Sequence, residues 1–320
     1  MNCVVTGAAG FIGSHLCERL LNLGHTVVGI DNFMPYYGRE LKEANLVGSL
    51  RQSRFQFRCL DLRQDSLEAA LEGAEVVIHL AAMPGLVQSW VDFDGYLSCN
   101  VTATQRILET LRRIGGDLHR FILGSTSSVY GRTASGDETV IPHPISPYGV
   151  TKLAAEQLCK AYAVMDDLPL VILRFFSVYG PRQRPDMAYH QFIEAMLRHQ
   201  PITVFGDGQQ VRGNTYVIDC VQAILASLNG NIGETYNIGG GEAATIWDII
   251  ARLGKVAGRA PIIKQEPARA GDQRYTFADT TKLQRHCGWQ PLVGLDEGLR
   301  AQWHWQAQRF AAVDNWKKAA

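Results

Sequence analysis

The sequence predicts an α/β protein, in which a parallel sheet with helices on both faces is followed by a smaller, mainly helical part. Three observations carry this prediction. Strand-like and helix-like segments alternate through the first half of the chain, a glycine-rich turn follows the first strand, and the alternation stops near residue 176. With 320 residues, 46% of them hydrophobic, the chain is long enough to bury a large core.

Short runs of β-branched and other apolar residues predict six strands, at Cys3–Thr6, Thr26–Ile30, Phe55–Cys59, Val76–Leu80, Arg120–Gly124 and Leu170–Phe175. Amphipathic segments between them predict helices at Ile12–Leu23, Leu67–Leu71, Asn100–Ile114 and Tyr148–Val164. Alternation at this spacing forms βαβ units, so we expect a Rossmann-type, doubly wound parallel sheet.

Because the alternation of strand-like and helix-like segments stops near residue 176, we expect two domains. Residues 1–175 should form the domain with the parallel sheet, and residues 176–320 a smaller C-terminal substrate domain. Longer loops rich in Gly, Pro and Arg follow residue 176, with helices expected at 188–199, 245–257 and 294–312. We expect the chain to return to the first domain near 216–229.

Composition excludes several classes of protein. The 31 basic and 31 acidic residues balance, which argues against non-specific binding to nucleic acid. No apolar run approaches the roughly 18 residues of a membrane span, and no signal peptide is expected at the N-terminus. The seven cysteines are scattered, which fits single thiols in a reducing compartment, and no histidine lies at a metal-ligand spacing. A cytoplasmic protein without a metal is therefore expected.

The first turn has the features of a dinucleotide site. Gly7, Gly10 and Gly13 lie between a strand and a helix, where glycines allow backbone N–H groups to approach a pyrophosphate. Asp31 ends the second strand, eighteen residues past Gly13. Its carboxylate can accept hydrogen bonds from both ribose hydroxyls and would repel a 2′-phosphate, which favours NAD over NADP. Asp61 could flank the adenine, although a strand-end Asp is usually a cap.

A candidate catalytic pair lies on the helix that begins near Tyr148. Tyr148 and Lys152 are one turn apart and therefore share a face. A free phenol titrates near 10, but an ammonium close by lowers its pKa toward the range of a useful base. Upstream, Ser125–Ser128 offers four consecutive hydroxyls after a strand. Each motif alone is common, as a surface pair or a polar turn; their order after a glycine loop is much more specific.

These motifs resemble those of the extended short-chain dehydrogenase/reductases, the group of NAD-dependent nucleotide-sugar epimerases, dehydratases and decarboxylases. The resemblance runs through nearly the whole chain, and within the group it is greatest to bacterial UDP-glucuronate 4-epimerases. Its main segments are TGAAGFIGSHL at 6–16, HLAA at 79–82, STSSVYG at 125–131, SPYGVTK at 146–152, RFFSVYGPRQRPDMA at 174–188, GDGQQ at 206–210, TYVIDC at 215–220 and YNIGGG at 236–241.

The resemblance implies roles for individual residues. Tyr148 would be the base, Lys152 would position it and the NAD ribose, and Thr126 would share the proton of the sugar hydroxyl. NAD binding would fall to Gly7, Gly10, Phe11, Ile12, Gly13, Asp31, Asn32, Asp61, Leu62, Leu80, Ala81, Ala82, Asn100, Ser125, Tyr148, Lys152, Phe175 and Val178. UDP-sugar binding would fall to Gln88, Thr126, Ser127, Ser128, Ser177, Arg184, Phe205, Gln210, Arg212, Arg269 and Asp272.

The reaction expected from the resemblance is 4-epimerisation of UDP-glucuronate through a transient 4-keto sugar. Family dehydratases carry Asp-Glu after the threonine, whereas Ser127 and Ser128 stand here, so 4,6-dehydration is disfavoured. Three alternatives stay open: a UDP-glucose or UDP-GlcNAc 4-epimerase, a UDP-glucuronate decarboxylase, and a non-catalytic NAD-binding regulator. Gln88 and Gln191 stand where the resemblance implies arginines, and Asn214 follows Arg212-Gly213 in an altered loop, which leaves the sugar open.

A homodimer is the expected assembly. In the family that these residues resemble, segments corresponding to Asn100–Ile114 and Ala154–Val164 pack against a twofold mate as a four-helix bundle. The alternative is that both segments merely cover the sheet.

Overall fold

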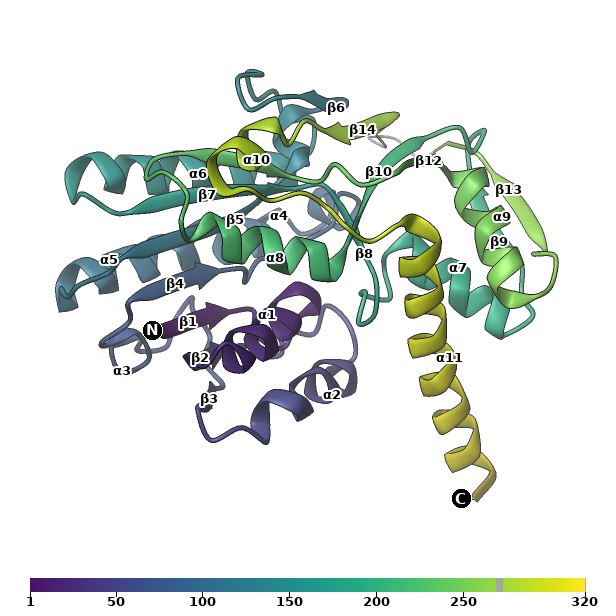
Figure 1. Ribbon diagram of the computed structural model, residues 1–320, viewed down its shortest axis with the longest axis horizontal. Coiled ribbons are helices and arrows are strands. Elements are labelled where there is room, and N and C mark those ends of the chain that lie inside the picture. The colour runs from purple at the N-terminus through teal and green to yellow at the C-terminus, as the bar shows by residue number, and fades with distance from the viewer. Residues whose placement is uncertain (269–272, 320) are drawn as a thin grey trace.

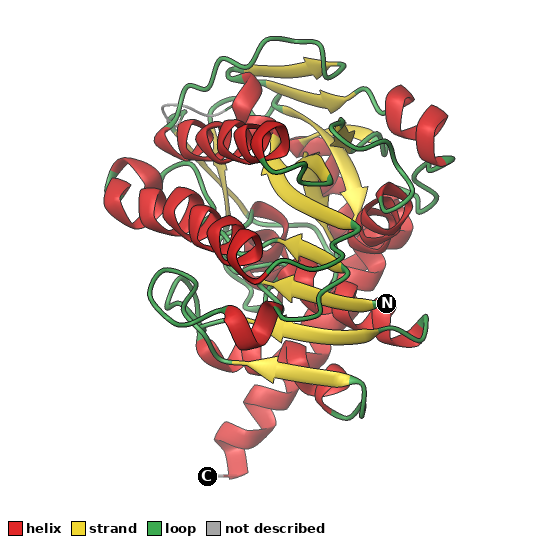
Figure 2. Ribbon diagram, turned by 90° about the vertical axis from the view of Figure 1, so that its left-hand side faces the viewer, coloured by secondary structure: helices red, strands yellow, loops and turns green. Residues whose placement is uncertain are grey.

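The main sheet has seven strands. It forms the centre of the larger part of the molecule (Figures 1 and 2). The computed structural model describes residues 1–268 and 273–319, and the side chains among them as far as residue 312. All neighbouring strands of this sheet are parallel. Their order is β11 (Thr235–Ile238), β7 (Leu170–Phe175), β5 (Arg120–Thr126), β4 (Val76–His79), β1 (Asn2–Thr6), β2 (Thr26–Ile30) and β3 (Phe55–Arg58).

Helices cover both faces of the sheet because successive strand residues point to opposite sides. Val5 and Ile122 belong to a core cluster shared with α1 and α8, whereas their neighbours Val4 and Phe121 belong to a second cluster shared with α5 and α6. The covering helices are α1 (Phe11–Asn22), α2 (Arg39–Leu50) and α8 (Val217–Ser227) on one face, and α3 (Glu68–Leu71), α5 (Ala103–Ile114) and α6 (Pro147–Met165) on the other. The Rossmann-type fold class is thereby confirmed.

The six expected strands all form, with ends within two residues of the expected ones. Helix α2 was not expected, because the side chains on its buried face are mostly polar: Lys42, Asn45 and Ser49 accompany Leu46. A helix whose buried face is polar lacks the apolar periodicity on which sequence reasoning depends. The expected helix at Asn100–Ile114 begins instead with a π-helical turn, Ser98–Thr102, which passes into α5.

The smaller part combines helices with short strands that the sequence analysis did not resolve. Its core contains residues of α7, α9 and α11. A five-stranded sheet has the order β12-β10-β14-β6 with β8 beside β10, and β9 pairs with β13. The bounds are α7 (Ala188–Leu197), α9 (Ile246–Ala257), α10 (Thr281–Cys287), α11 (Leu295–Ala319), β6 (Thr133–Gly136), β8 (Ser177–Tyr179), β9 (Ile202–Phe205), β10 (Val211–Tyr216), β12 (Ala243–Thr245), β13 (Ile263–Glu266) and β14 (Tyr275–Ala278).

The two parts are interwoven. Beyond residue 175, α8 packs on α1 and β11 extends the main sheet beside β7, while β6 from the first half pairs with β14 of the second. The division into residues 1–175 and 176–320, with a return near 216–229, stays a prediction of the sequence. The strand pairing shows which segments cross that division.

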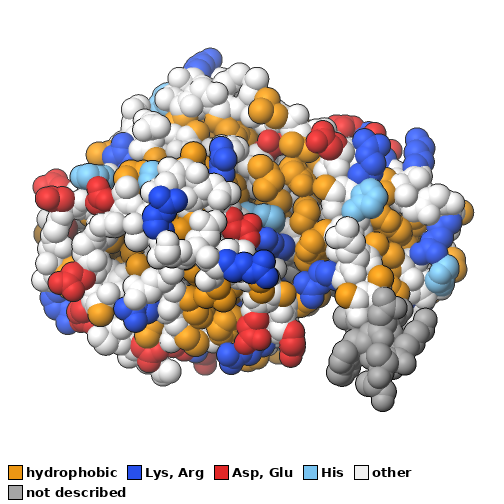
Figure 3. All heavy atoms as spheres, turned by 60° about the horizontal axis from the view of Figure 1, so that its bottom comes forward, with side chains coloured by type: hydrophobic (Ala, Val, Ile, Leu, Met, Phe, Trp, Pro, Cys, Tyr) orange, Lys and Arg blue, Asp and Glu red, His pale blue; other side chains and the backbone are white. Residues whose placement is uncertain are grey.

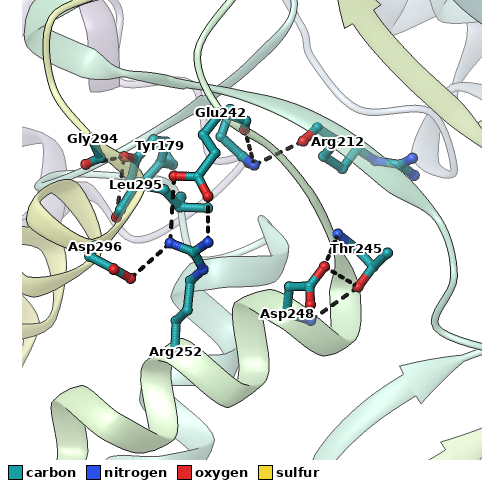
Figure 4. A network of polar contacts seen from close by, with 10 residues as sticks. Tyr179, Arg212, Glu242, Thr245, Asp248, Arg252, Gly294, Leu295 and Asp296 are labelled. Carbon is teal, nitrogen blue, oxygen red and sulfur yellow. Dashed lines mark hydrogen bonds and ion pairs between the residues drawn. The ribbon is translucent and has the colours of Figure 1, made fainter.

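Polar contacts fix α9 against its neighbours (Figure 4). Thr245 and Asp248 form a reciprocal capping box at its first turn. Farther along the helix, Arg252 pairs with Glu242 and donates to Asp296 Oδ1 at 3.0 Å. Since these side chains are partly exposed, each pair contributes at most about 1 kcal/mol. The network therefore orients the helix, and the apolar core supplies most of the stability.

The surface carries charges of both signs. On the face that Figure 3 shows, acidic and basic side chains alternate around hydrophobic ones. All seven cysteines, which lie in the described part of the chain, are free thiols. No helix among the described residues is long and apolar enough to cross a membrane.

Leu20 offers a test of the packing between α1 and the sheet. Its side chain is 0% exposed, so Leu20→Ala should lower the free energy of unfolding by about 2–5 kcal/mol. Leu23, just after the helix, is 48% exposed, and Leu23→Ala should change it by less than about 0.5 kcal/mol. Urea unfolding of the two variants measures both values. Equal losses would contradict this account of the core.

Candidate active site

A cavity of about 300 Å³ opens at the carboxyl ends of the central strands of the main sheet. In a doubly wound sheet this edge is where ligands bind. Nineteen of the residues singled out from the sequence line the cavity: Gly7, Gly10, Phe11, Ile12, Gly13, Asp31, Asn32, Asp61, Leu62, Leu80, Ala81, Ala82, Ser125, Thr126, Tyr148, Lys152, Phe175, Val178 and Arg184. The structure therefore brings together most of the expected cofactor residues and the expected catalytic ones.

The glycine-rich turn has no room for side chains. A Cβ on Gly13 would lie 2.2 Å from the carbonyl oxygen of Gly7, and one on Gly7, whose φ is +72°, would lie 2.9 Å from the backbone nitrogen of Ala81. No side chain caps the N-terminus of α1, and its first turn holds no acidic residue. The turn therefore presents backbone donors and the positive end of a helix to the cavity, which is the arrangement that suits a pyrophosphate.

Asp31 is fixed at the end of β2. Its carboxylate accepts hydrogen bonds from the backbone N–H groups of Ala9 at 3.2 Å and Phe33 at 2.8 Å. Lys42 Nζ lies 4.0 Å from Asp31 Oδ1 and donates to the carbonyl oxygen of Met34 at 2.9 Å. The carboxylate thus stands at the expected ribose end of the cavity, beside a buried ammonium that sequence reasoning missed.

The expected adenine end carries a second ion pair. Arg63 donates to Asp61 through Nη2 at 2.6 Å and through Nε at 2.9 Å. These hydrogen bonds, with a further one from Asn32, lower the pKa of the Asp61 carboxyl to about 2. Arg63 lines the cavity too, although nothing in its sequence context distinguished it from a solvated surface arginine.

Tyr148 is placed by the start of α6. Ser146 is the N-cap and accepts a hydrogen bond from the backbone N–H of Gly149 at 3.1 Å, so Tyr148 lies in the first turn of the helix. The phenol is buried beside the hydroxyl of Thr126 at the end of β5. Burial raises the pKa of Tyr148, while the hydrogen bond with Thr126 and the charge of Arg184 lower it.

Lys152 lies one turn further along α6, with 3% of its surface exposed. Burial lowers the pKa of this lysine to about 8, and the carboxylate of Glu156 opposes the change. Among the described residues, the cation whose charge lowers the pKa of Tyr148 is Arg184. The effect of Lys152 on the phenol stays a prediction.

Arg184 lies in the loop between β8 and α7, and it lines the cavity at the edge of the main sheet. It donates to both carboxylate oxygens of Asp186, at 2.9 Å each, and its guanidinium lies 5.9 Å from the ring centroid of Tyr36. Tyr36 follows β2, and burial and the charge of Asp186 raise the pKa of its phenol. Residues from both parts of the molecule thus meet over the cavity.

The same loop is anchored to the back of the glycine-rich turn. Arg182 pairs with Glu18 of α1 at 2.8 Å, and His15 Nε2 lies 2.9 Å from the carbonyl oxygen of Pro181. Arg182 has a φ of +67°, a left-handed conformation that is rare for a residue with a side chain. Contacts with α1 therefore hold the loop that presents Arg184.

Several expected site residues do not line the cavity. Asn100 is buried in the π-helical turn, where its amide bridges both backbone groups of Met83 and Thr151 Oγ1. Gln88 is exposed. Ser127 and Ser128 are buried beside Thr126. Ser177 lies on β8, Phe205 on β9, Gln210 in the loop before β10, and Arg212 on β10. Arg269 and Asp272 lie outside the described residues.

Sequence reasoning missed five charged or aromatic residues that line the cavity: Tyr36, Tyr37, Lys42, Arg63 and Phe176. The loop after β2 ends at the ligand edge of the sheet, so its pair of tyrosines could have been noticed from topology alone. Lys42 gave no signal, because a lysine on a helix is usually exposed.

Comparisons with known proteins agree with this geometry. Residues 3–239 match the model of the NAD dependent epimerase/dehydratase family. A Bacillus subtilis protein described as an uncharacterized UDP-glucose epimerase is 45% identical over 93% of this chain and 96% of its own length. The UDP-glucuronate 4-epimerase of Thermodesulfobacterium geofontis is 33% identical over 98% of both chains.

The solved structures include the UDP-glucuronic acid 4-epimerase of Bacillus cereus in complex with UDP-glucuronic acid and NAD. It is 45% identical, with a TM-score of 0.93, over 97% of this chain and all of that one. The family model matches more than half of the chain, and both relatives align over nearly its full length. The chain therefore belongs to the NAD-dependent epimerase/dehydratase family.

Proposed function

We propose that this protein is a UDP-sugar 4-epimerase that interconverts UDP-glucuronate and UDP-galacturonate with bound NAD. The observation that carries the proposal is the hydrogen-bonded pair of Thr126 and Tyr148 in the same cavity as the glycine-rich turn and Asp31. Oxidation of a sugar alcohol requires a general base next to the bound dinucleotide, and the phenol of Tyr148 can serve as that base. The similar proteins are described as epimerases of UDP-glucose or UDP-glucuronate, which supports the choice of a UDP-sugar as the substrate.

The chain's own residues would handle the proton. Bound NAD would supply the acceptor and later the donor for the hydrogen on C4 of the sugar. Tyr148 would take the proton from the 4-hydroxyl, with Thr126 as its hydrogen-bond partner, and would return it to the oxygen after the keto-sugar has turned over. A cationic Lys152 would favour the phenolate form during this exchange.

Two features support epimerisation over other outcomes. The positions after Thr126 hold Ser127 and Ser128, so no carboxylate stands there to eliminate water from C5 and C6. A 4-keto-glucuronate loses CO₂ when its carboxylate stands perpendicular to the carbonyl group. Hydroxyl donors that grip the carboxylate would prevent that geometry, and Thr126, which lines the cavity, offers such a hydroxyl.

An anionic sugar fits the charge around Tyr148. Among the described residues, the charged side chains that line this end of the cavity are Lys152 and Arg184, both cations. Gln88 is exposed and Gln191 donates to the carbonyl oxygen of Asp186 at 3.3 Å, and neither lines the cavity. The two glutamines therefore leave the charge of the cavity lining unchanged, and the uronate stays the first choice of sugar.

Binding of the UDP group is assigned to Arg184, Phe205, Gln210 and Arg212. Gln210 is 7% exposed; its amide donates to the carbonyl oxygen of Phe205 at 2.8 Å, and its Oε1 has no hydrogen-bond partner among the described residues. A buried acceptor of this kind is costly unless a donor meets it. The imide N–H of a uracil is such a donor.

A homodimer is proposed as the assembly, in the cytoplasm. Trp90, Val91 and Phe93 are 65%, 78% and 44% exposed, and Val150 of the neighbouring helix α6 is 48% exposed. Farther along α6, Ala154 is also exposed. Large apolar side chains gathered on adjacent elements are typical of an interface. A second copy packed on α6 and the segment before α5 would bury them.

The role of Tyr148 can be tested by Tyr148→Phe. Loss of the acid–base group should lower kcat by about 10²–10⁴-fold, measured by NMR of the sugar products, without loss of bound NAD. Tyr162→Phe is the matched control, because Tyr162 lies on the same helix but its hydroxyl contacts Glu109, outside the cavity. Undiminished turnover in Tyr148→Phe would refute the role of base.

Substrate choice can be tested with a panel of UDP-sugars. The kcat/KM value should be at least about tenfold higher for UDP-glucuronate than for UDP-glucose or UDP-GlcNAc, because only the uronate offers a charge to the cations. No UDP-pentose should form. A preference for UDP-glucose, which the Bacillus subtilis relative's description names, would replace the uronate with the neutral hexose.

The proposed dimer can be tested by Ala154→Glu, which places a charge in the middle of the exposed face of α6. Sedimentation should show a shift from dimer to monomer, since an unpaired charge at an interface costs several kcal/mol. Val47→Glu, on the exposed side of α2, should leave the dimer intact. A wild-type protein that sediments as a monomer would exclude the assembly.

A further inference from the structure

A buried carboxylate lies one turn beyond Lys152. Glu156 is 0% exposed and accepts hydrogen bonds from Arg174 Nη2 at 2.7 Å, from Arg174 Nε at 3.0 Å and from Ser125 Oγ at 2.5 Å. Ser125 itself lines the cavity. Ion pairs of this kind are costly to bury, and a hydrophobic pair of the same volume would often be as stable. Stability alone gives a weak reason for these charges.

The pair continues into a network that joins the elements around the cavity. Arg174 of β7 is 3% exposed and also donates to the hydroxyl of Tyr130 at 2.9 Å, which donates to Asn237 of β11 at 2.8 Å. Glu156 therefore has a fixed position relative to β5, β7 and α6. Its charge is held at one place beside Lys152.

Few groups act electrostatically on Lys152. On its own helix these are Glu156 and Cys159, while Tyr148 lies one turn before it. His79 faces it from β4, and its pKa is lowered to about 3 by burial and by the charge of Lys152, so it is neutral. Burial raises the pKa of the Cys159 thiol to about 12, so it too is neutral.

Ser125 and Thr126 of β5 line the same cavity as Lys152. Arg174 of β7 carries the same sign of charge as Lys152, and its ion pair with Glu156 offsets that charge. Arg184, on the far side of Tyr148, is paired with Asp186. Lys152 Nζ forms no hydrogen bond to any described residue. Among these groups, the carboxylate that opposes the effect of burial on the pKa of this ammonium is Glu156.

We propose that Glu156 is a positioning residue whose buried charge keeps Lys152 protonated at neutral pH. The inference rests on the proposed function in one respect, since the epimerisation uses the charge of Lys152 to favour the phenolate of Tyr148. Glu156 does not line the cavity and acts through the lysine.

The protonation of Lys152 can be measured directly by NMR of protein labelled with [ε-13C]lysine, with Lys152→Arg to assign the signal. A lysine is charged below its pKa, so loss of a neighbouring anion moves its titration to lower pH. The midpoint in Glu156→Gln should fall by about one to two pH units. Glu156→Asp, which keeps the carboxylate, should stay within about half a unit of the wild type. An unchanged midpoint in Glu156→Gln overturns the proposal.

The pH profile of turnover gives a second readout that loss of packing would not move. If Lys152 must be charged, kcat falls as pH rises through its pKa, and this alkaline limb should shift to lower pH in Glu156→Gln. The loss relative to wild type should be small at pH 6 and grow to about tenfold or more at pH 9. Glu68→Gln, which breaks an exposed ion pair with Arg113, is the matched control and should leave the profile unchanged. A loss of kcat that is equal at every pH would assign Glu156 a structural role only.

The two proposals can fail separately. If wild-type protein does not epimerise any UDP-sugar but the Lys152 titration shifts as described, the proposed function fails and the positioning role stands. If epimerisation is observed and the titration does not shift, the proposed function stands and the positioning role of Glu156 fails. Should neither Glu156 variant fold, a wild-type Lys152 signal that is neutral at pH 7 still overturns the proposal.

Discussion

The parallel pairing of β1, β4, β5 and β7 is the constraint on which the site depends. Parallel strands end at the same edge, so residues far apart in the chain meet there: the glycine turn after β1, Leu80 to Ala82 after β4, Thr126 at the end of β5 and Phe175 at the end of β7. Helix α6, which covers one face of the sheet, brings Tyr148 to the same edge. No single segment forms the cavity, and the strands that contribute are joined to one another by backbone hydrogen bonds.

The parts of the fold that could be predicted from sequence are those where local pattern and tertiary environment agree. The runs at Val76–Leu80 and Leu170–Phe175 are apolar because both faces of the sheet are covered, and they form β4 and β7 within a residue of the expected ends. Gly7 and Gly13 could be predicted for a similar reason, since backbone geometry there admits no side chain. In these places one physical requirement determines both the residue and the structure.

The rest could not be predicted because its stability comes from contacts between distant residues. Helix α2 buries polar side chains whose partners, such as the carbonyl oxygen of Ala9 for Asn45, lie far away in the sequence. The resemblance assigns Asn100 to the cofactor site, whereas in the structure its side-chain amide is hydrogen-bonded to Met83 and Thr151. The strands of the smaller part are short and pair across the chain, as β6 does with β14, so their pattern is too brief to recognise.

The anchoring of the Arg184 loop to α1, through Arg182 and Glu18, has a kinetic consequence. The segment that faces the sugar is braced against the helix whose first turn would hold the pyrophosphate of the dinucleotide. A movement of α1 during release of the dinucleotide would therefore also move the Arg184 loop, so that the coenzyme and the sugar would not exchange independently. A reaction that gives back the hydrogen it removes needs no fresh coenzyme between cycles, and a long residence time is compatible with it.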